Sequence, residues 1–275
     1  MYMRKDIDTA YAKVSIGQHW LDDERSLEAM CAGADIKAGD HVLEIGPGHG
    51  TLTKKLIDRG AFVTAVEIDL DLTYELKGKF SGDNFRLYVG SILQFDFNTL
   101  PKGYKVVANI PYYLTSNLLR LLCESTNPFS FASLLVQKEV AERVAAKPGD
   151  MSLLSVSVQF YCNTGVGPVV PAKLFSPPPK VDSQILLLEY TGPKFADVDR
   201  KQFFQLVRAG FSERRKKLIN SLSGGFNISK KDAKLLLENA GIDPHRRAQE
   251  LSLIDWHNLY KVVQNSKAPP AQIYT

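Results

Sequence analysis

An amide side chain, backbone carbonyls and an aromatic ring come together in the four residues Asn109, Ile110, Pro111 and Tyr112. They follow the apolar run 106–108, which predicts a buried strand. Pro111 cannot donate to a strand ladder and keeps the preceding residue extended, so the strand must end here. The strand ends of an open α/β sheet face its ligand cleft, where these groups suit a planar base with an exocyclic amine. An ordinary turn above a packed tyrosine is the alternative for these four residues alone.

A glycine-rich turn follows the first clear strand, residues 41–45, and opens a helix. Residues 44–50 read Glu-Ile-Gly-Pro-Gly-His-Gly, and Gly46 and Gly48 allow the backbone to approach a ligand closely. A dinucleotide-binding loop would place its third glycine one residue later, where this chain has Thr51. The spacing resembles the first motif of class I methyltransferases, whose ligand is S-adenosylmethionine. A tight connection without a ligand is the alternative for the turn alone.

Two further strand ends carry groups that suit a nucleotide. Glu67 ends the second strand, and its carboxylate can accept hydrogen bonds from ribose hydroxyls, as acids at this place also do in dehydrogenases. Ser91 and Ile92 follow the third strand, where an adenine ring would lie, although Ile92 also reads as core. His19 is a residue type that often serves as a general base, but its place in a loop beside Gln18 favours contact with the carboxylate end of the ligand over that role.

Alternating strands and helices predict an α/β fold with a doubly wound, mostly parallel sheet. Two late strands at 153–161 and 181–190, joined without a helix, indicate a final antiparallel pair. Gly192-Pro193 marks the expected boundary between a nucleotide-binding domain, 1–192, and a helical domain with a frayed tail, 193–275. Helices are expected in the second domain at 201–211, 214–222, 230–239 and 253–263.

Positive charge is concentrated in the C-terminal part of the chain. Residues 194–263 hold 14 basic and 8 acidic residues, whereas the whole chain has a net charge of only +4. This asymmetry indicates a polyanionic partner, although a solvated basic helix is the alternative. The cations expected to contact RNA lie on a helical segment whose inner face is predicted to hold Phe204, Val207 and Phe211: Arg208, Arg214, Arg215, Lys216 and Lys217.

Composition narrows the cellular setting. The three cysteines are isolated and odd in number, which favours a reducing compartment over a disulfide framework or zinc site. Residues 1–13 carry charges of both signs, unlike a secretory signal, and no apolar stretch is long enough to span a bilayer. We therefore expect a cytoplasmic protein that binds neither membrane nor metal.

Six motifs, taken together and in order, make the chain similar to the ribosomal RNA adenine dimethyltransferases, and within them to the KsgA branch. The resemblance runs from about residue 17 to residue 263, and the combination is highly specific. The motifs are Gln18–Leu21, Glu44–Gly50, Asn109–Tyr112, Gln137–Arg143, Phe175–Ser183 and Phe211–Lys216.

The resemblance implies a Rossmann-like class I methyltransferase domain followed by a small all-α domain. It implies S-adenosylmethionine as cofactor, and as substrate two adjacent adenosines near the 3′ end of small-subunit (16S) ribosomal RNA, met by a monomer within a pre-ribosomal particle. It further implies that Asn109, Tyr112 and Phe175 hold the target base. The residues expected to bind the cofactor are Gln18, His19, Leu21, Gly46, Gly48, Glu67, Ser91, Ile92 and Asn109.

The expected reaction is an in-line attack of adenine N6 on the sulfonium methyl. Asn109 Oδ1 and the Ile110 carbonyl would accept the two N–H bonds of the amine and direct its lone pair, so that positioning replaces a metal or strong base. Methylation of large-subunit RNA is the nearest alternative. A non-enzymatic ribosome-assembly factor is the other, and Ser91, where the family usually has Asp, points toward it. A dehydrogenase fits neither the glycine spacing nor residues 109–112.

Overall fold

The structure, a computed structural model, describes residues 19–266. These residues form two compact units, which are described separately. Of the described residues, the first unit comprises 19–141 together with Gly165–Tyr190, and the second comprises Glu142–Thr164 and 191–266. The sequence placed one boundary near residue 192 and assigned everything before it to the first domain. The prediction and the structure therefore differ over residues 142–164, which the structure assigns to the second unit.

A seven-stranded sheet in the order β4-β3-β2-β5-β6-β9-β7 organises the first unit. The five strands from β4 to β6 are parallel, and β9 pairs antiparallel to β6. The strands are β2 (His41–Ile45), β3 (Phe62–Glu67), β4 (Phe85–Val89), β5 (Lys105–Asn109), β6 (Phe131–Gln137), β7 (Cys162–Val170) and β9 (Ser183–Tyr190). This arrangement confirms the predicted mostly parallel sheet.

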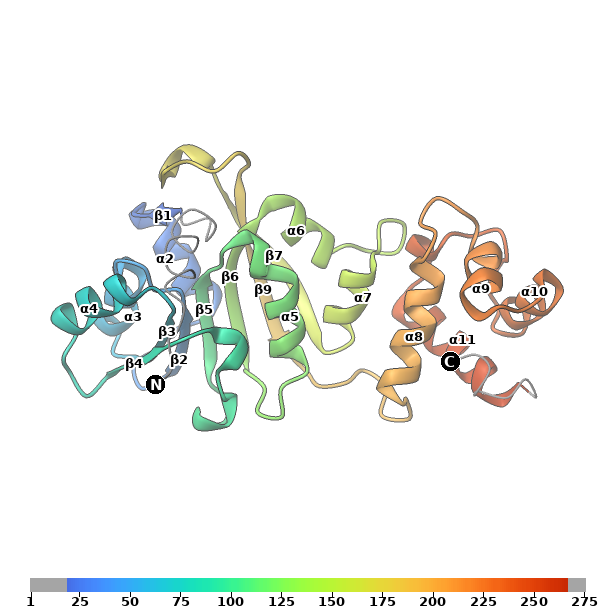
Figure 1. Ribbon diagram of the computed structural model, residues 1–275, viewed down its shortest axis with the longest axis horizontal. Coiled ribbons are helices and arrows are strands. Elements are labelled where there is room, and N and C mark those ends of the chain that lie inside the picture. Colours follow the sequence, from blue (N-terminus) through green and yellow to red (C-terminus); the bar gives the residue numbers. More distant parts are fainter. Residues whose placement is uncertain (1–18, 267–275) are drawn as a thin grey trace, which may run out of the picture. The chain divides into compact units, whose positions relative to one another are not determined.

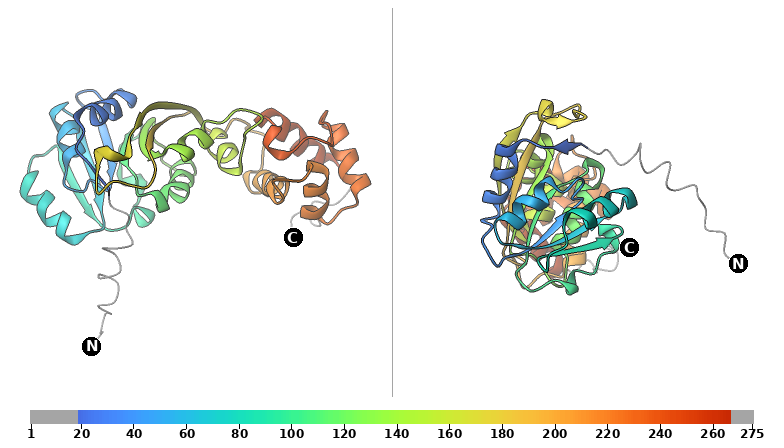
Figure 2. Two further views of the ribbon diagram at one scale, coloured as in Figure 1. Left: turned by 90° about the horizontal axis from the view of Figure 1, so that it is seen from above. Right: turned by 90° about the vertical axis from the view of Figure 1, so that its left-hand side faces the viewer.

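Helices cover both faces of this sheet (Figures 1 and 2), with α2 and α3 on one side and α5 on the other. The helices are α2 (Glu24–Gly33), α3 (Thr51–Asp58), α4 (Leu70–Lys79), α5 (Thr115–Cys123) and α6 (Lys138–Val144). Leu27, Met30 and Cys31 of α2 are buried, as their helical spacing predicts. They pack in a core with strand residues of one parity, such as Val63 and Val107.

Short elements complete the edge of the sheet where the parallel strands end. Strand β1 (Trp20–Leu21) pairs antiparallel with β8 (Phe175–Ser176) and brings the start of the described chain next to a segment far along the sequence. The short 3-10 helices are η1 (Ile92–Gln94), η2 (Phe97–Thr99), η3 (Tyr112–Leu114) and η4 (Ala172–Leu174). No helix within residues 19–266 is long and apolar enough to cross a membrane.

The segment predicted as a strand over 153–161 is instead helix α7 (Leu153–Gln159). The alternation of apolar and polar residues suggested a strand, but Ser152 and Ser155 form a capping box that starts a helix. Phe160, just after the helix, packs its ring 5.1 Å from that of Phe203 and 5.3 Å from that of Phe204. Tertiary packing thus outweighs the local pattern, and the expected edge strand is formed by β7.

The second unit is otherwise helical, as predicted. Its further elements are α8 (Arg200–Phe211), α9 (Leu218–Phe226), α10 (Lys230–Asn239), η5 (Ala248–Glu250) and α11 (Leu253–Asn265). Gln249 ties the segment before α7 to this unit, because its side-chain amide donates to the Gly149 carbonyl at 3.0 Å. Its own carbonyl accepts from the backbone amides of Gly149 and Met151 at 2.9 and 3.1 Å. These bonds explain why 142–164 belongs with the C-terminal helices.

The helix predicted over 214–222 begins only at Leu218. Residues 212–217 form an exposed turn, in which Ser212 donates its hydroxyl to the Ala209 carbonyl at 2.8 Å. Four consecutive cations occupy this turn, and like charges three or four residues apart repel on a helix. The predicted inner face is otherwise correct, since Phe204 and Val207 of α8 are buried and Phe211 is half-buried.

Two adjacent glycines of α9 provide a test of the packing between α8 and α9. A Cβ at Gly225 would lie 2.7 Å from Ala209 Cβ and 3.0 Å from Ala209 Cα, whereas a Cβ at Gly224 meets nothing within 4 Å. Gly225→Ala should therefore lower the free energy of unfolding by about 1–3 kcal/mol. Gly224→Ala should leave it unchanged or raise it by up to about 1 kcal/mol. Urea denaturation of both variants measures the difference, and equal effects would contradict this packing.

Candidate functional site

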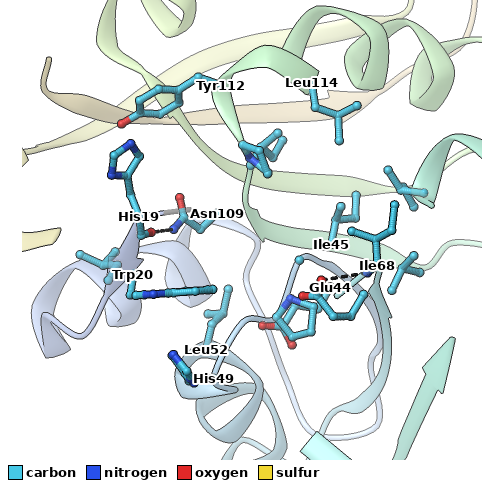
Figure 3. Close-up of a pocket in the computed structure, with 18 of the residues that line it drawn as sticks. His19, Trp20, Glu44, Ile45, His49, Leu52, Ile68, Asn109, Tyr112 and Leu114 are labelled. Atoms are coloured by element: carbon cyan, nitrogen blue, oxygen red, sulfur yellow. Dashed lines mark hydrogen bonds between the residues drawn. The ribbon is translucent and has the colours of Figure 1, made fainter. Parts of the chain in front are cut away.

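A cavity of about 290 Å³ opens at the carboxyl ends of the parallel strands in the first unit. The turn after β2, the ends of β3 and β5, η1 and the β1 segment all contribute to its wall. Nine residues predicted from the sequence line it: His19, Leu21, Gly46, Glu67, Ser91, Ile92, Asn109, Ile110 and Tyr112. The cavity therefore brings together groups from widely separated parts of the chain (Figure 3).

Asn109 is the last residue of β5, and its side chain is fixed by one hydrogen bond. Its amide nitrogen donates to the His19 carbonyl at 2.9 Å. Figure 3 shows the amide oxygen directed away from this bond. Because one N–H is bound to the His19 carbonyl, the side chain is oriented with its oxygen free to accept a hydrogen bond from a ligand.

The Tyr112 side chain lies above this amide, and both its hydroxyl and its ring contact neighbouring side chains. Its hydroxyl shares a 2.8 Å hydrogen bond with Ser183 Oγ, and its ring centroid is 5.7 Å from that of His19, with an angle of 31° between the rings. Burial raises the pKa of the Tyr112 hydroxyl, so it stays neutral at physiological pH. Tyr112 therefore offers a held aromatic surface at the cavity wall.

His19 links the cavity to the segment around Pro177. Its Nδ1 lies 2.7 Å from the Pro177 carbonyl oxygen, which can only accept, so Nδ1 carries the proton. Next to it, Trp20 pairs with Ser176 and Leu21 with Phe175 across the β1–β8 strands. The bond and the strand pairing fix the backbone carbonyl that holds Asn109.

Glu67, at the end of β3, is a buried carboxylate held by backbone amides. Oε1 accepts from Ile68 and Asp69 at 2.8 and 2.9 Å, and Oε2 lies 3.4 Å from the Gly48 amide. Burial raises the pKa of Glu67, while these three bonds act in the opposite direction by stabilising the ionised form. The carboxylate is thereby oriented at the cavity wall, where ribose hydroxyls can reach it.

Glu44 also lines the cavity and was not among the residues predicted for the site. Its side chain is 1% exposed; Oε2 accepts a 2.6 Å hydrogen bond from Thr53, and Oε1 has no partner among the described residues. Burial is the main cause that raises the pKa of Glu44 to about 8. The available sequence signal was an acid within the apolar strand 42–45.

Ser91 caps η1, and its hydroxyl accepts from the Leu93 amide at 3.3 Å. Ile92, next in the chain, is 5% exposed and lies at the cavity wall. Part of the acceptor capacity of Ser91 is thus used within its own turn. The Ser91 hydroxyl therefore has less acceptor capacity left for a ligand than an aspartate carboxylate would have at this position.

Comparison with known proteins decides the family. The family model described as "Ribosomal RNA adenine dimethylase" matches residues 10–265. The chain belongs to the ribosomal RNA adenine dimethylase family. It is an enzyme of the adenine dimethyltransferase class, as the sequence motifs predicted.

Two relatives match this chain over about nine tenths of its length. A protein of Dehalococcoides mccartyi named ribosomal RNA small subunit methyltransferase A is 44% identical over 260 residues, which cover 91% of this chain and 88% of the relative. A protein of the same name from Clostridium botulinum is 40% identical over 252 residues, covering 89% of this chain and 91% of the relative.

Solved structures confirm the class I methyltransferase fold of the dimethylase. A dimethyladenosine transferase from Plasmodium falciparum superposes with a TM-score of 0.73 at 30% identity, covering 88% of this chain and 96% of that one. The 23S rRNA methyltransferase ErmE superposes with a TM-score of 0.72 at 26% identity, covering 90% and 100%.

Some predicted site residues lie elsewhere in the dimethylase structure. Phe175 is 4% exposed and packs in the core with Leu21, so it does not line the cavity, and the predicted sandwich with Tyr112 is not formed. Gly48 does not line the cavity either, and its amide instead contacts Glu67. Gln18 lies outside the described residues.

Trp20, which the site prediction omitted, lines the cavity of the dimethylase. Its ring centroid is 4.6 Å from that of His49, and a Cβ at Gly48 would lie 2.4 Å from the Trp20 ring. Gly48 has a φ of +59°, so its conformation and the close approach of Trp20 both require glycine. The space left by the missing side chain at Gly48 is therefore occupied by the Trp20 ring, which forms part of the cavity wall, and not by the ligand.

The predicted RNA-contacting cations all lie exposed in the second unit. Arg208 is on α8, and residues 214–217 occupy the turn after it. Lys216 pairs with Glu213 at 2.6 Å, and Lys217 Nζ lies 3.1 Å from His245 Nδ1. Within residues 19–266, no cluster of three His, Cys, Asp or Glu side chains suits a metal ion, and the three cysteines are buried and form no disulfide.

The buried acid Glu44 should make the stability of the protein depend on pH. Its pKa is raised from 4.5 to about 8 in the folded state, so the unfolded chain binds fewer protons in this window and stability falls as pH rises. Glu44→Gln should remove this loss and stabilise the protein at pH 8 by on the order of 4 kcal/mol, with no gain near pH 4. Urea denaturation of both proteins across this range measures it.

The exposed acid Glu124, in the same unit, provides the control. Glu124→Gln should leave the pH dependence of stability nearly unchanged, because surface ion pairs contribute little. A stability difference between the wild type and Glu44→Gln that does not vary with pH would contradict the buried, protonated state of Glu44.

Proposed function

We propose that this protein transfers methyl groups from S-adenosylmethionine to N6 of two adjacent adenosines near the 3′ end of small-subunit ribosomal RNA. The name of two relatives, which are 40% and 44% identical over about nine tenths of the chain, supports the small-subunit substrate. The observation that carries the chemistry is the acceptor that Asn109 presents to the cavity while its nitrogen is bound to His19. We further propose a cytoplasmic monomer that acts on a pre-ribosomal particle in subunit biogenesis.

The residues of the cavity fit the cofactor. Glu67 provides a fixed carboxylate for ribose hydroxyls, and Ser91 and Ile92 provide a polar and an apolar contact for an adenine ring. When bound, S-adenosylmethionine supplies a methyl group on a positively charged sulfur. The unpartnered buried oxygen of Glu44 is a further sign that the cavity is shaped for a polar, positively charged ligand.

Asn109 and Ile110 would position the target amine. The lone pair of adenine N6 is delocalised into the ring, so the amine is a poor nucleophile. Hydrogen bonds from its two N–H groups to Asn109 Oδ1 and the Ile110 carbonyl would fix its orientation toward the methyl group. Good alignment of this kind can lower a barrier by roughly 7–11 kcal/mol without any general base.

Tyr112 would hold the base that has left its stack. Unstacking a base from RNA costs a few kcal/mol, and an aromatic contact returns about 1–3 kcal/mol. Because Phe175 is buried in the core, Tyr112 and not Phe175 would supply this contact. The bond from its hydroxyl to Ser183 keeps the ring in place for the base.

Asn109→Ala should abolish methylation while the affinity for S-adenosylmethionine falls less. The variant removes the acceptor for the amine but leaves Glu67 and η1 in place. Single-turnover methylation of purified small ribosomal subunits, together with calorimetric titration of the cofactor, measures both effects. Undiminished turnover would contradict the proposed role of Asn109.

The Tyr112 series serves as the matched control. Tyr112→Phe keeps the ring and loses only the Ser183 bond, so it should retain most of the rate, whereas Tyr112→Ala should lose most of it. Purified large subunits belong in the same assay, because the likeness to ErmE makes their RNA the competing substrate. Methylation of large subunits only would overturn the small-subunit assignment, and cofactor binding without methylation of either subunit would indicate an assembly factor.

The exposed cations of the turn 212–217 should bind RNA phosphates. Arg214→Gln combined with Arg215→Gln should lower the slope of log affinity against log salt by about 1–2, because each lost phosphate contact removes about 0.7–0.9. The charge-matched control is Lys230→Gln combined with Lys231→Gln on the exposed start of α10. Equal slopes for both double variants would reject the turn as the specific contact.

A further inference from the structure

We propose that Glu44 distinguishes the positively charged sulfonium cofactor from its neutral thioether product by releasing a proton to solvent when the sulfonium enters the cavity. This inference rests on the proposed function only in that the cavity binds S-adenosylmethionine. It assigns a specificity role to a residue that neither contacts the target base nor holds the ribose.

The sheet register places Glu44 between the two ends of the cavity. Strand β2 lies between β3 and β5, and Glu44 is in register with Ala65 on one side and Val107 on the other. Glu67 and Asn109 are two residues further along those neighbouring strands. Because strand side chains alternate between faces, both project on the same face as Glu44, one step nearer the strand ends.

A ligand that spans from Glu67 to Asn109 must therefore cross β2 above Glu44. In S-adenosylmethionine the atom that joins the ribose arm to the transferred methyl group is the positively charged sulfur. A ligand with its ribose at Glu67 and its methyl group directed to the amine held by Asn109 thus brings its sulfonium over Glu44. No other buried acid among the described residues lies on this line.

The surroundings of Glu44 leave its charge uncompensated until a cation arrives. The Thr53 hydroxyl donates a 2.6 Å hydrogen bond to Oε2 and the Thr53 backbone amide also favours the ionised form, while Oε1 is buried without a partner among the described residues. These contacts from one residue do not offset the cost of burying the charge, so burial raises the pKa of Glu44 to about 8. A neighbouring positive charge favours the ionised form and lowers that pKa.

A proton released when the cofactor binds has to be assigned to Glu44 and not to the other titratable groups near it. Glu67 on β3 is a like charge that raises the pKa of Glu44 further. Cys31 on α2 interacts with Glu44 but stays neutral, since burial raises its own pKa to about 11. His19 and His49 line the same cavity.

Methyl transfer would remove the positive charge that stabilises the ionised form of Glu44. As the bond from the methyl carbon to N6 forms and its bond to sulfur breaks, the amine would lose one N–H proton to solvent and the sulfonium would become a neutral thioether. The positive charge above Glu44 would thereby be lost, and the carboxylate would take back one proton from solvent. The proton released on cofactor entry and the proton regained with the product balance. The product thus meets a neutral acid, and the electrostatic contribution that favoured the cofactor is absent.

Calorimetric titration in buffers of different ionisation enthalpy measures the protons directly. S-adenosylmethionine should release close to one proton per site at pH 7, and its affinity should rise by up to tenfold per pH unit below about pH 8. S-adenosylhomocysteine, the thioether, should release almost none. Equal proton release by both ligands, or none by either, would overturn the inference.

Three variants assign the proton to a residue. Glu44→Gln should abolish proton release and flatten the pH dependence for the cofactor without affecting the thioether. Thr53→Val, which removes only the hydrogen bond to Oε2, should retain proton release and move it to higher pH. Glu67→Gln should weaken both ligands in parallel and keep proton release.

Loss of proton release in Glu67→Gln but not in Glu44→Gln would overturn the assignment to Glu44. Absence of cofactor binding by the wild type at any pH would overturn the proposed function together with this inference. Binding without proton release would overturn the inference alone.

Discussion

The bond between the Asn109 amide and the His19 carbonyl joins two segments that are 90 residues apart in the chain. It orients the amide, because the nitrogen is held at the His19 carbonyl while the oxygen points away from it and can accept from a ligand. The His19 carbonyl is held in turn by the pairing of β1 with β8 and by the hydrogen bond from the His19 ring to the Pro177 carbonyl. The segment around residues 175–177 therefore acts on the site from a distance, through the backbone that it fixes.

The parallel sheet supplies the second constraint. Parallel strands end at the same edge of the sheet. The residues at their ends therefore line a common cavity without any additional structural element. The register then decides which side chains share a face, and it sets Glu44, Glu67 and Asn109 on the side covered by α2 and α3. The glycine turn after β2 follows from the same arrangement, since the ring of Trp20 packs against Gly48 where any side chain would collide.

Most of this architecture could be predicted from the sequence because its signals are local. Apolar runs ended by Asn-Ile-Pro-Tyr, by a glycine turn or by Glu67 mark strand ends, and strand ends mark the cavity. Where the prediction was wrong, the deciding interactions join distant residues. The residues after Ser152 alternate like a strand, yet they fold as α7 because Phe160 packs against Phe203 and Gln249 binds Gly149. Phe175 has the right type for a stacking ring, but its pairing with Leu21 buries it.

Glu44 and Glu67 show why the chemistry of a site is harder to infer than its location. Both are buried glutamates in neighbouring strands, and the sequence offers no reason to treat their charges differently. The structure gives Glu67 backbone donors from three residues, whereas Thr53 alone donates to Glu44, so the protein stabilises the ionised form of Glu67 better. The difference arises because the backbone turns after β3 and presents its amides to Glu67, whereas α3 presents only Thr53 to Glu44. A carboxylate satisfied by the protein can orient a neutral hydroxyl, while one that is left unsatisfied gains most from a positive ligand.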